Sequence, residues 1–346
     1  MHGVAIIGAG HVGKIRTRVI KNSLEAEVRI VADVDATHAR ALAETVNAQA
    51  TTDWLAAVQS HDIDIVVICT PTKFHAEAAK SALRAGKHVL CEKPLARSVT
   101  EAVEVIEMAT DEQRLLKTGF NYRYMDHVRA AKELLETGAL GPLYFLRCNY
   151  GHGGRPGYEK HWCTDQDLSG GGALLEQGIH ILDLVRHLLG EPVQVLAQTS
   201  RFFWGFPEVE DNCFLLLKTE AVQTAQIHVS WTQWVNVFSL ELFGRDGYLH
   251  LTGRDGHYGP QRLVWGKRQA DHSRPCEEVF EFPSVDDSWE REWKDFLGAL
   301  KSNHPMMGGA ADSLRALQLV EAAYQSSRQQ AWIDVQPAIE FARSTT

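Results

Sequence analysis

The feature that most constrains this chain is a glycine-spaced turn near its start. The apolar run Val4–Ile7 ends at Gly8, and Gly10 and Gly13 complete the spacing G-x-G-x-x-G ahead of a helix-compatible stretch. In such a strand, turn and helix, the glycines permit a tight turn, close approach of the backbone to a pyrophosphate, and close helix packing. The helix N-terminus also offers N–H groups to an anion. The turn therefore predicts a dinucleotide site with contacts from Gly8, Gly10, His11, Val12 and Gly13.

An acidic residue follows at the distance that such a fold uses. The second apolar run, Val28–Val34, carries Asp33 near its end, where a dinucleotide fold places an acid on the ribose hydroxyls. Asp33 favours NAD, and the further acid Asp35 disfavours the additional 2′-phosphate of NADP. Arg40, the first arginine after Asp33, keeps NADP as the less favoured alternative.

Length and composition narrow the class of protein. A chain of 346 residues, with 45% hydrophobic and 23% charged residues, is long enough for two globular domains. The net charge of -9 comes without a basic block, which disfavours nucleic acid and anionic membranes as partners. The longest apolar run, Ile63–Cys69, is too short to span a bilayer, and Met1–Gly3 shows no secretion signal, so we expect a cytoplasmic protein. Six cysteines without C-x-x-C pairing indicate free thiols and no metal site.

Strand-like and helix-like stretches alternate along the first third of the chain. This rhythm predicts a parallel sheet covered on both faces, in a first domain spanning residues 1–121. The expected strands after the second run are 63–69, 88–91 and 115–120, and the expected helices are 37–46, 54–58, 74–84 and one capped by Ser98 that ends at Ala109.

Ligands of such sheets lie at the carboxyl ends of the strands. Thr70, Pro71 and Thr72 follow one strand directly, so we expect them to flank the cofactor. His75 is either a further contact or a partly exposed histidine in the first turn of a helix, with equal weight. Glu92 and Lys93 follow the next strand, which would place the Lys93 ammonium beside the nicotinamide, although a random lysine before a turn is usually a surface residue.

These residues together resemble those of the glucose-fructose oxidoreductase, inositol dehydrogenase and rhizopine-catabolism (Gfo/Idh/MocA) family. The resemblance rests on the glycine turn, Asp33, Thr70-Pro71-Thr72-x-x-His75, Glu92-Lys93-Pro94, Asn121-Tyr122-Arg123 and the segment from Gly170-Gly171-Gly172 through Glu176 and His180 to Asp183. It covers essentially the whole chain. It implies an α/β protein with an N-terminal Rossmann domain, followed by a C-terminal α/β domain with a large, open, mostly antiparallel sheet. It also implies Asn121 as a cofactor contact.

The second half supports this architecture by its own pattern. Six strand-like runs are joined by short polar or glycine turns with few helices between them, and two helices close the chain. We expect a substrate-binding and oligomerisation domain over residues 122–346, with strands at 143–150, 193–199, 212–219, 223–230, 237–243 and 248–252, and helices at 289–302 and 311–329.

The triple-glycine segment carries the expected chemistry. Ser169–Gly172 is expected to open a helix on which Glu176, His180 and Asp183 recur on one face. On spacing alone this is more often an exposed charge pair. The resemblance implies that Lys93, Glu176 and His180 are catalytic, although the family usually has aspartate where Glu176 stands, which weakens the transfer of a specific inositol activity. His180 would take the hydroxyl proton, Lys93 would stabilise the oxygen charge or relay the proton, and Glu176 would bind a neighbouring hydroxyl or orient His180. The order of proton transfer between Lys93 and His180 is left open by the sequence.

Several groups are candidates for holding the substrate. A glycine-rich loop from Tyr150 to Tyr158 has polar and aromatic tips, and loops of this kind commonly bind ligands. Trp231 has the ring to stack on a sugar, though a tryptophan in a sheet is more often core. Arg123 and Arg155 are suited to bind a phosphate or carboxylate, which keeps nucleotide-sugars among the candidate substrates. The predicted substrate residues are Tyr122, Arg123, His152, Arg155, Tyr158, Trp162 and Trp231.

The function predicted is NAD-dependent oxidation of a secondary alcohol on a cyclitol, sugar or sugar derivative, or reduction of the ketone. Three alternatives stand beside it: an enzyme that retains NAD and cycles it internally, as a glycosidase-like or isomerising member does; a nucleotide-sugar 3-dehydrogenase; and a dinucleotide-sensing protein without turnover. Because an open sheet leaves a face that needs cover, we expect a homodimer or homotetramer formed through the C-terminal sheet.

Overall fold

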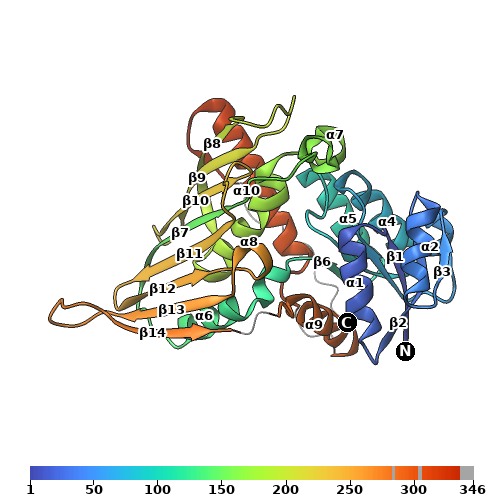
Figure 1. Cartoon of the computed structure of the whole chain (residues 1–346), viewed down its shortest axis with the longest axis horizontal. Coiled ribbons are helices and arrows are strands. Elements are labelled where there is room, and N and C mark those ends of the chain that lie inside the picture. The colour runs from blue at the N-terminus through green and yellow to red at the C-terminus, as the bar shows by residue number, and fades with distance from the viewer. Residues whose placement is uncertain (283–284, 303–305, 336–346) are drawn as a thin grey trace.

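The first 118 residues form a parallel sheet with the strand order β3-β2-β1-β4-β5-β6 (Figure 1). The computed structural model describes residues 1–282, 285–302 and 306–335. The strands are β1 His2–Ile7, β2 Ala26–Ala32, β3 Gln49–Thr51, β4 Ile65–Ile68, β5 His88–Cys91 and β6 Leu116–Thr118. The helices between them are α1 His11–Lys21, α2 Ala36–Glu44, α3 Trp54–Gln59, α4 His75–Arg84 and α5 Val99–Asp111. This is the predicted Rossmann arrangement, with the order reversing between β1 and β4.

Both faces of this sheet are buried, and one of them is covered by the far end of the chain. Along β1, Val4 and Ile6 pack with Trp293 and Phe296 of α9 (Ser288–Ser302), whereas the alternate residues belong to the core beneath α4 and α5. Alternation of side chains along a strand makes such a two-sided core possible. Helix α9 therefore completes the hydrophobic core of the first sheet although it lies almost 290 residues from the N-terminus.

The second sheet has nine strands in the order β14-β13-β12-β11-β7-β10-β9-β8-β15. Only the pairing of β10 with β7 is parallel, so the prediction of a mostly antiparallel sheet is confirmed. The strands are β7 Leu143–Gly151, β8 Pro192–Ser200, β9 Asn212–Thr219, β10 Thr224–Ser230, β11 Val237–Gly244, β12 Gly247–Thr252, β13 Arg262–Lys267, β14 Cys276–Glu281 and β15 Ile333–Asp334.

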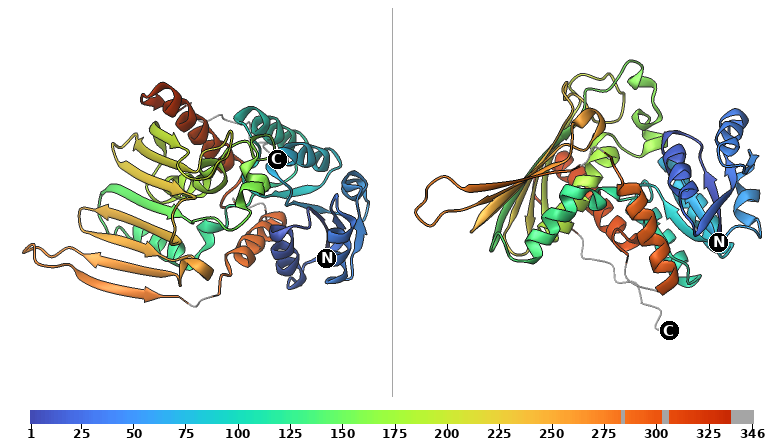
Figure 2. Two further views of the ribbon diagram at one scale, coloured as in Figure 1. Left: turned by 45° about the horizontal axis from the view of Figure 1, so that its top comes forward. Right: turned by 60° about the horizontal axis from the view of Figure 1, so that its bottom comes forward.

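Helices cover one face of this sheet and leave the other open (Figure 2). Helices α6 (Asp126–Glu136), α8 (Ile179–Leu188) and α10 (Ala310–Gln329) lie between the large sheet and the Rossmann sheet, and α10 contacts both β8 and α5. The pattern of β9 shows the consequence, because its alternate residues Phe214, Leu216 and Lys218 are exposed while Leu215 and Leu217 are buried. No helix in the described part of the chain is both long and apolar enough to cross a membrane.

Most of the expected elements are confirmed, and the differences have local causes. Strands β3, β13 and β14 and helix α6 were not predicted. The predicted helix from Ser169 is wrong in detail: Gln166–Ser169 forms the short α7, Gly170 ends it at φ +87°, and a π-helical turn at Leu174–Gly178 precedes α8. Glu176 therefore lies on the π turn and His180 on α8, not on one continuous α-helix.

A buried ion pair fastens three elements where the two sheets meet. Arg123, in the 3₁₀ turn Asn121–Tyr124, donates from Nε and Nη2 to the two carboxylate oxygens of Asp183 on α8, at 2.8 and 2.6 Å. Asp312 on α10 also contacts the Arg123 guanidinium, at 3.0 Å. This arrangement corrects the expectation that Arg123 holds a substrate anion, because its fork is already occupied by protein carboxylates.

Asp183→Ala should therefore lower the free energy of unfolding by about 3–5 kcal/mol, since it leaves a buried guanidinium without its main partner. Chemical denaturation of the purified variant measures this loss. Glu133→Ala is the matched control, because Glu133 is 72% exposed and only 4.0 Å from Arg129, and its removal should change stability by less than about 0.5 kcal/mol. Equal effects of the two substitutions would contradict a structural role for the Arg123–Asp183 pair.

Candidate functional site

The glycine turn has two glycines that the protein itself requires and one that it does not. Gly8 has φ +101°, and a Cβ there would lie 2.7 Å from the backbone of Cys69. A Cβ on Gly13 would lie 2.1 Å from the carbonyl oxygen of Gly8, which only a glycine avoids. A Cβ on Gly10, by contrast, would meet no protein atom within 4 Å. The open space over Gly10, at the N-terminus of α1, suits the close approach of a pyrophosphate.

A cavity of about 1260 Å³ extends from this turn to the second sheet. Ten of the predicted cofactor residues line it on the Rossmann side: Gly8, Gly10, His11, Val12, Asp33, Thr70, Pro71, His75, Glu92 and Lys93. Gly13, Thr72 and Asn121 do not line it. Gly13 packs against the turn, Thr72 is buried, and the Asn121 amide donates to Ser288 Oγ at 2.9 Å.

Asp33 directly follows β2, lines the cavity and is hydrogen-bonded to the glycine turn. Its Oδ2 accepts a hydrogen bond from Ala9 N at 2.6 Å, and its Oδ1 accepts one from Asp35 N at 2.9 Å. The Asp35 carboxylate points instead into its own helix, where it caps α2 by accepting from Thr37 N and His38 N. The structure thus places a fixed carboxylate where the ribose of a dinucleotide belongs.

His75 connects the segments that follow strands β4 and β5. Its Nδ1 lies 2.7 Å from the carbonyl oxygen of Pro94 and its Nε2 lies 2.8 Å from that of Thr70, so it joins the segments after β4 and β5. Burial lowers the pKa of His75, and a neutral ring donates to one of these carbonyls at a time. The side chain is 1% exposed, which overturns the interpretation of a partly exposed histidine in a first turn.

Glu92 and Lys93 follow β5 and face different partners. Glu92 Oε1 accepts from Nε of Arg16 at 2.7 Å, and the same guanidinium lies 2.7 Å from Glu292 of α9. Lys93 Nζ donates to the backbone carbonyl of Glu176 at 2.6 Å and to its Oε2 at 3.0 Å. Glu92, Lys93 and Glu176 all line the cavity, so the structure joins the carboxyl end of β5 to the π turn of the second half.

His180 lies behind this pair and does not line the cavity. Its ring stacks on Tyr122 with centroids 3.9 Å apart and planes 4° apart, and Phe120 meets it edge-on. Its Nδ1 is buried without a hydrogen-bond partner. Burial lowers the pKa of His180 well below its usual value, and the positive charges of Lys93 and Arg254 lower it further. The imidazole is therefore neutral at neutral pH, close to Lys93, and has a nitrogen available to accept a proton.

The expected orientation of His180 by Glu176 does not appear among the contacts of the described residues. Glu176 Oε2 is used by Lys93 and its Oε1 is buried without a partner. The turn that carries Glu176 is held by Glu210, whose Oε1 accepts from Leu174 N at 2.8 Å and whose Oε2 accepts from Gly172 N at 3.2 Å.

The predicted substrate residues divide into two groups. His152, Arg155, Tyr158 and Trp162 line the cavity on the side of the second sheet. Tyr122, Arg123 and Trp231 are buried outside it: the Tyr122 hydroxyl contacts that of Tyr150, and Trp231 Nε1 donates to Gln177 Oε1 at 3.0 Å. For Trp231 the alternative of a core tryptophan is what the structure shows.

The loop after β12 and the start of β11 supply residues that the sequence analysis missed. His257, Tyr258 and Asn236 line the cavity, and Arg254 lies close behind Tyr258. The glycines at 253, 256 and 259, directly after a strand, mark this loop in the sequence and were the available signal. Among the residues that the structure describes, no group of three or more histidine, cysteine, aspartate or glutamate side chains is arranged to hold a metal ion.

Comparison with known proteins assigns both halves to one family. Residues 2–120 match the model described as "Oxidoreductase family, NAD-binding Rossmann fold", and residues 128–250 match the model of the GFO/IDH/MocA C-terminal domain. Inositol 2-dehydrogenase of Rhizobium meliloti is 26% identical over 339 residues, covering 95% of this chain and 98% of that protein. D-glucoside 3-dehydrogenase of Escherichia coli is 35% identical over 197 residues, covering 55% of this chain and 54% of that protein.

A solved structure shares the fold over nearly the whole chain. Levoglucosan dehydrogenase in complex with NADH and levoglucosan superposes with a TM-score of 0.87 at 23% identity, covering 97% of this chain and 100% of that one. Together with the two family models, the Rossmann topology and the glycine cradle, this places the chain: it belongs to the Gfo/Idh/MocA family of oxidoreductases, and its first domain binds NAD.

Proposed function

We propose that the protein is an NAD-dependent dehydrogenase that oxidises a secondary alcohol of a sugar or cyclitol, or reduces the corresponding ketone. The observation that carries the proposal is the Lys93–Glu176 contact, which holds an ammonium group at the cavity surface beside a neutral, buried His180. Relatives named for activity on inositol and on a glucoside support the substrate class. We also propose that residues 1–121 supply the cofactor contacts and residues 122–346 the substrate contacts.

In this proposal the chain holds the alcohol and moves its proton. Gly8, Gly10 and Asp33 would hold NAD, which would supply the acceptor for the hydride of the carbinol carbon, or its donor in the reverse direction. Lys93 Nζ contacts the reacting oxygen and stabilises the negative charge that develops there. His180, neutral because burial and two nearby cations disfavour its protonated form, lies behind Lys93 and receives a proton from the Lys93 ammonium as Lys93 takes the hydroxyl proton. Glu176 holds Lys93 and offers its unpartnered Oε1 to a neighbouring hydroxyl.

The catalytic roles predict a selective loss of turnover. Lys93→Ala and His180→Ala should each lower kcat/KM by roughly 10²–10⁴-fold, the contribution typical of a positioned acid or base. The assay offers myo-inositol, glucose, methyl glucoside and levoglucosan with NAD and follows the absorbance of reduced nicotinamide. Lys73→Ala is the control, since Lys73 pairs with the exposed Asp167 and should be dispensable.

Two results would contradict these roles. Turnover that is unchanged in both variants would assign the chemistry to other residues, and bound cofactor without net production of NADH would support internal cycling. The pH profile tests His180 separately: because its pKa lies well below 6.5, its protonation should limit kcat/KM only on the acid side of that value. An acid limb that moves when His180 is replaced by glutamine assigns the limb to this residue.

Two substitutions in the glycine turn should differ in their effects: Gly13→Ala should affect both stability and cofactor binding, and Gly10→Ala should affect cofactor binding alone. Gly13→Ala should lower both, because its Cβ collides with the Gly8 carbonyl at 2.1 Å. Gly10→Ala should leave the melting temperature unchanged, since its φ of −72° suits alanine and no protein atom is near, yet weaken NADH at least about tenfold by occupying the phosphate space. Thermal melts and NADH fluorescence titration measure the two effects. NADH affinity unaltered by Gly10→Ala would contradict the assigned cradle.

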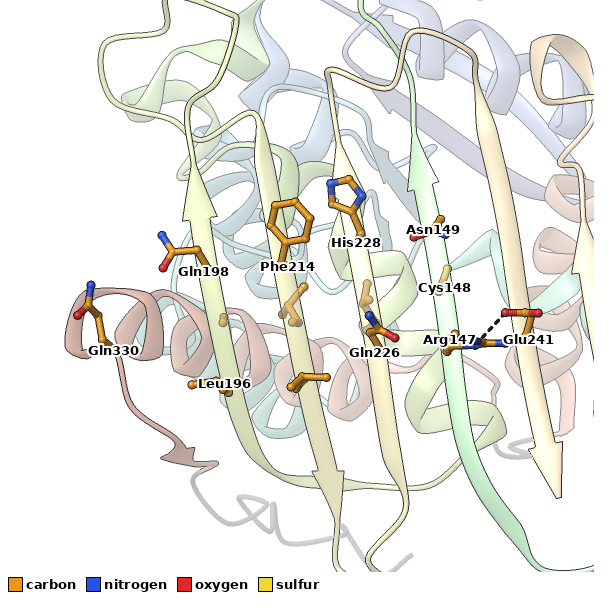
Figure 3. A pocket seen from close by; sticks show the side chains of 14 residues that line it. Arg147, Cys148, Asn149, Leu196, Gln198, Phe214, Gln226, His228, Glu241 and Gln330 are labelled. Carbon is orange, nitrogen blue, oxygen red and sulfur yellow. Dashed lines mark ion pairs between the residues drawn. The ribbon is translucent and has the colours of Figure 1, made fainter. Parts of the chain in front are cut away.

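We further propose that the open face of the large sheet joins two copies of the chain. Figure 3 shows the pocket on this face, over β8, β9, β10, β7 and β11. The hollow has a volume of about 600 Å³, and Phe214, which lines it, is 42% exposed. The hollow also carries Gln198, Gln226 and the Arg147–Glu241 ion pair, a mixture of apolar and polar groups that resembles interfaces between subunits.

Light scattering should then find a dimer or a larger assembly, and Phe214→Glu should shift it toward the monomer because a charge would be buried in the interface. Leu55→Glu, which alters a leucine of equal exposure on α3, is the control and should leave the assembly intact. A monomeric wild-type protein at micromolar concentration would remove the proposal.

A further inference from the structure

One partly buried cation near the proposed catalytic groups has no carboxylate partner among the described residues. The guanidinium of Arg254, directly after β12, lies over the rings of Tyr258, Tyr122 and Tyr150 at 4.6, 5.1 and 5.8 Å. Its Nε is buried and makes no hydrogen bond. Asp286 acts on it from a longer distance, and no carboxylate of the described residues forms an ion pair with it. The three tyrosine faces attract the cation but do not neutralise it.

The other buried cations of this region are paired, which sets Arg254 apart. Lys93 is bonded to Glu176, Arg123 to Asp183, and Arg16 to Glu92 and Glu292. Removing a charge from water without a partner costs free energy, so an unpaired cation directly behind Tyr258 of the cavity wall is best explained by an anion that arrives with the ligand. Tyr258, which lines the cavity, and Tyr122, which stacks on His180, place Arg254 on the substrate side and away from the glycine turn.

Two further groups extend this positive region. Burial and the charges of Arg254 and Arg155 lower the pKa of His152 to about 4, so the histidine is neutral and lies in the electric field of both arginines. Its Nδ1 accepts from Gly154 N at 3.0 Å, which leaves the Nε2 hydrogen as a donor. His152 and the exposed Arg155 both line the cavity, and Arg155 too lacks an ion pair among the described residues.

We propose that Arg254, with Arg155 and His152, binds an anionic group on the substrate, so that the preferred substrate is an acidic sugar: a sugar carboxylate or a sugar phosphate. A guanidinium recognises either group through paired N–H donors. The inference rests on the proposed dehydrogenase function and adds the charge of the substrate to it. Arg254 is then a specificity-determining residue, while Lys93 and His180 act at the carbinol.

The test compares matched neutral and acidic substrates in the wild-type protein and in Arg254→Met. Glucose is paired with glucuronate for the carboxylate and with glucose 6-phosphate for the phosphate, and kcat/KM is measured with NAD. We expect the wild type to favour one acid, and Arg254→Met to reduce the ratio of kcat/KM for that acid to kcat/KM for glucose by roughly 30-fold or more. Arg254→Lys should recover part of the loss. Arg129→Met, which alters an arginine on α6 whose side chain is 42% exposed, should change neither.

The controls separate this inference from the proposed function. Turnover of glucose without preference for either acid, or equal losses for neutral and acidic substrates in Arg254→Met, would overturn the inference and leave the dehydrogenase standing. Weaker NADH binding by Arg254→Met would also overturn it, by assigning the arginine to the cofactor. No turnover of any sugar would reject the proposed function itself.

A second measurement covers a variant that fails to fold. Inorganic phosphate should inhibit glucose oxidation by the wild type in competition with the sugar and not with NAD, and the exposed Arg155→Met should weaken this inhibition. Phosphate that competes with NAD alone, or does not inhibit, would contradict the site.

Discussion

The two hydrogen bonds between Lys93 and Glu176 are the interaction on which the candidate site depends. They join residues 83 positions apart and bring the carboxyl end of a Rossmann strand onto the first turn of a helix that packs on the large sheet. The segments that carry Lys93 and Glu176 are each held by a further residue. His75 ties the Pro94 carbonyl next to Lys93, and Glu210 binds the N–H groups at the start of the Glu176 turn. Such support is what keeps reacting groups within the small tolerances that catalysis requires.

A second constraint comes from helix α9, which packs against the Rossmann sheet although it lies far from it in the sequence. Helix α9 supplies Trp293 and Phe296 to the core of the first sheet and Glu292 to the ion pair of Arg16. Burial raises the pKa of Glu292, although the charge of Arg16 opposes this. Because Arg16 also binds Glu92, a residue of the cavity wall, the position of the segment after β5 depends on α9. The cavity wall at Glu92 is thus held in place by α1 and α9, two helices that lie far apart in the sequence.

The sequence predicted what local rules determine and missed what distant contacts decide. The glycine turn, the parallel strands and the alternating strands of the second half follow from periodicity and turn chemistry, which act over a few residues. The helical spacing of Glu176 and His180 was misleading because Lys93, from the Rossmann domain, takes the carboxylate, while the His180 ring stacks on Tyr122. Arg123 and Trp231 have side chains suited to ligands, yet neighbours far along the chain, Asp183 and Gln177, use them internally.

The charges around His180 explain why a buried histidine suits this place better than an exposed one. An exposed imidazole titrates near neutrality and would be partly protonated, so part of the protein would lack a base. Here burial and the fields of Lys93 and Arg254 all disfavour the imidazolium, while stacking on Tyr122 holds the ring. Glu176 neutralises the nearer cation, Lys93, and the farther one, Arg254, has no such partner. A substrate anion beside Arg254 would weaken one of the fields that lower the pKa of His180, making the base stronger when the ligand is in place.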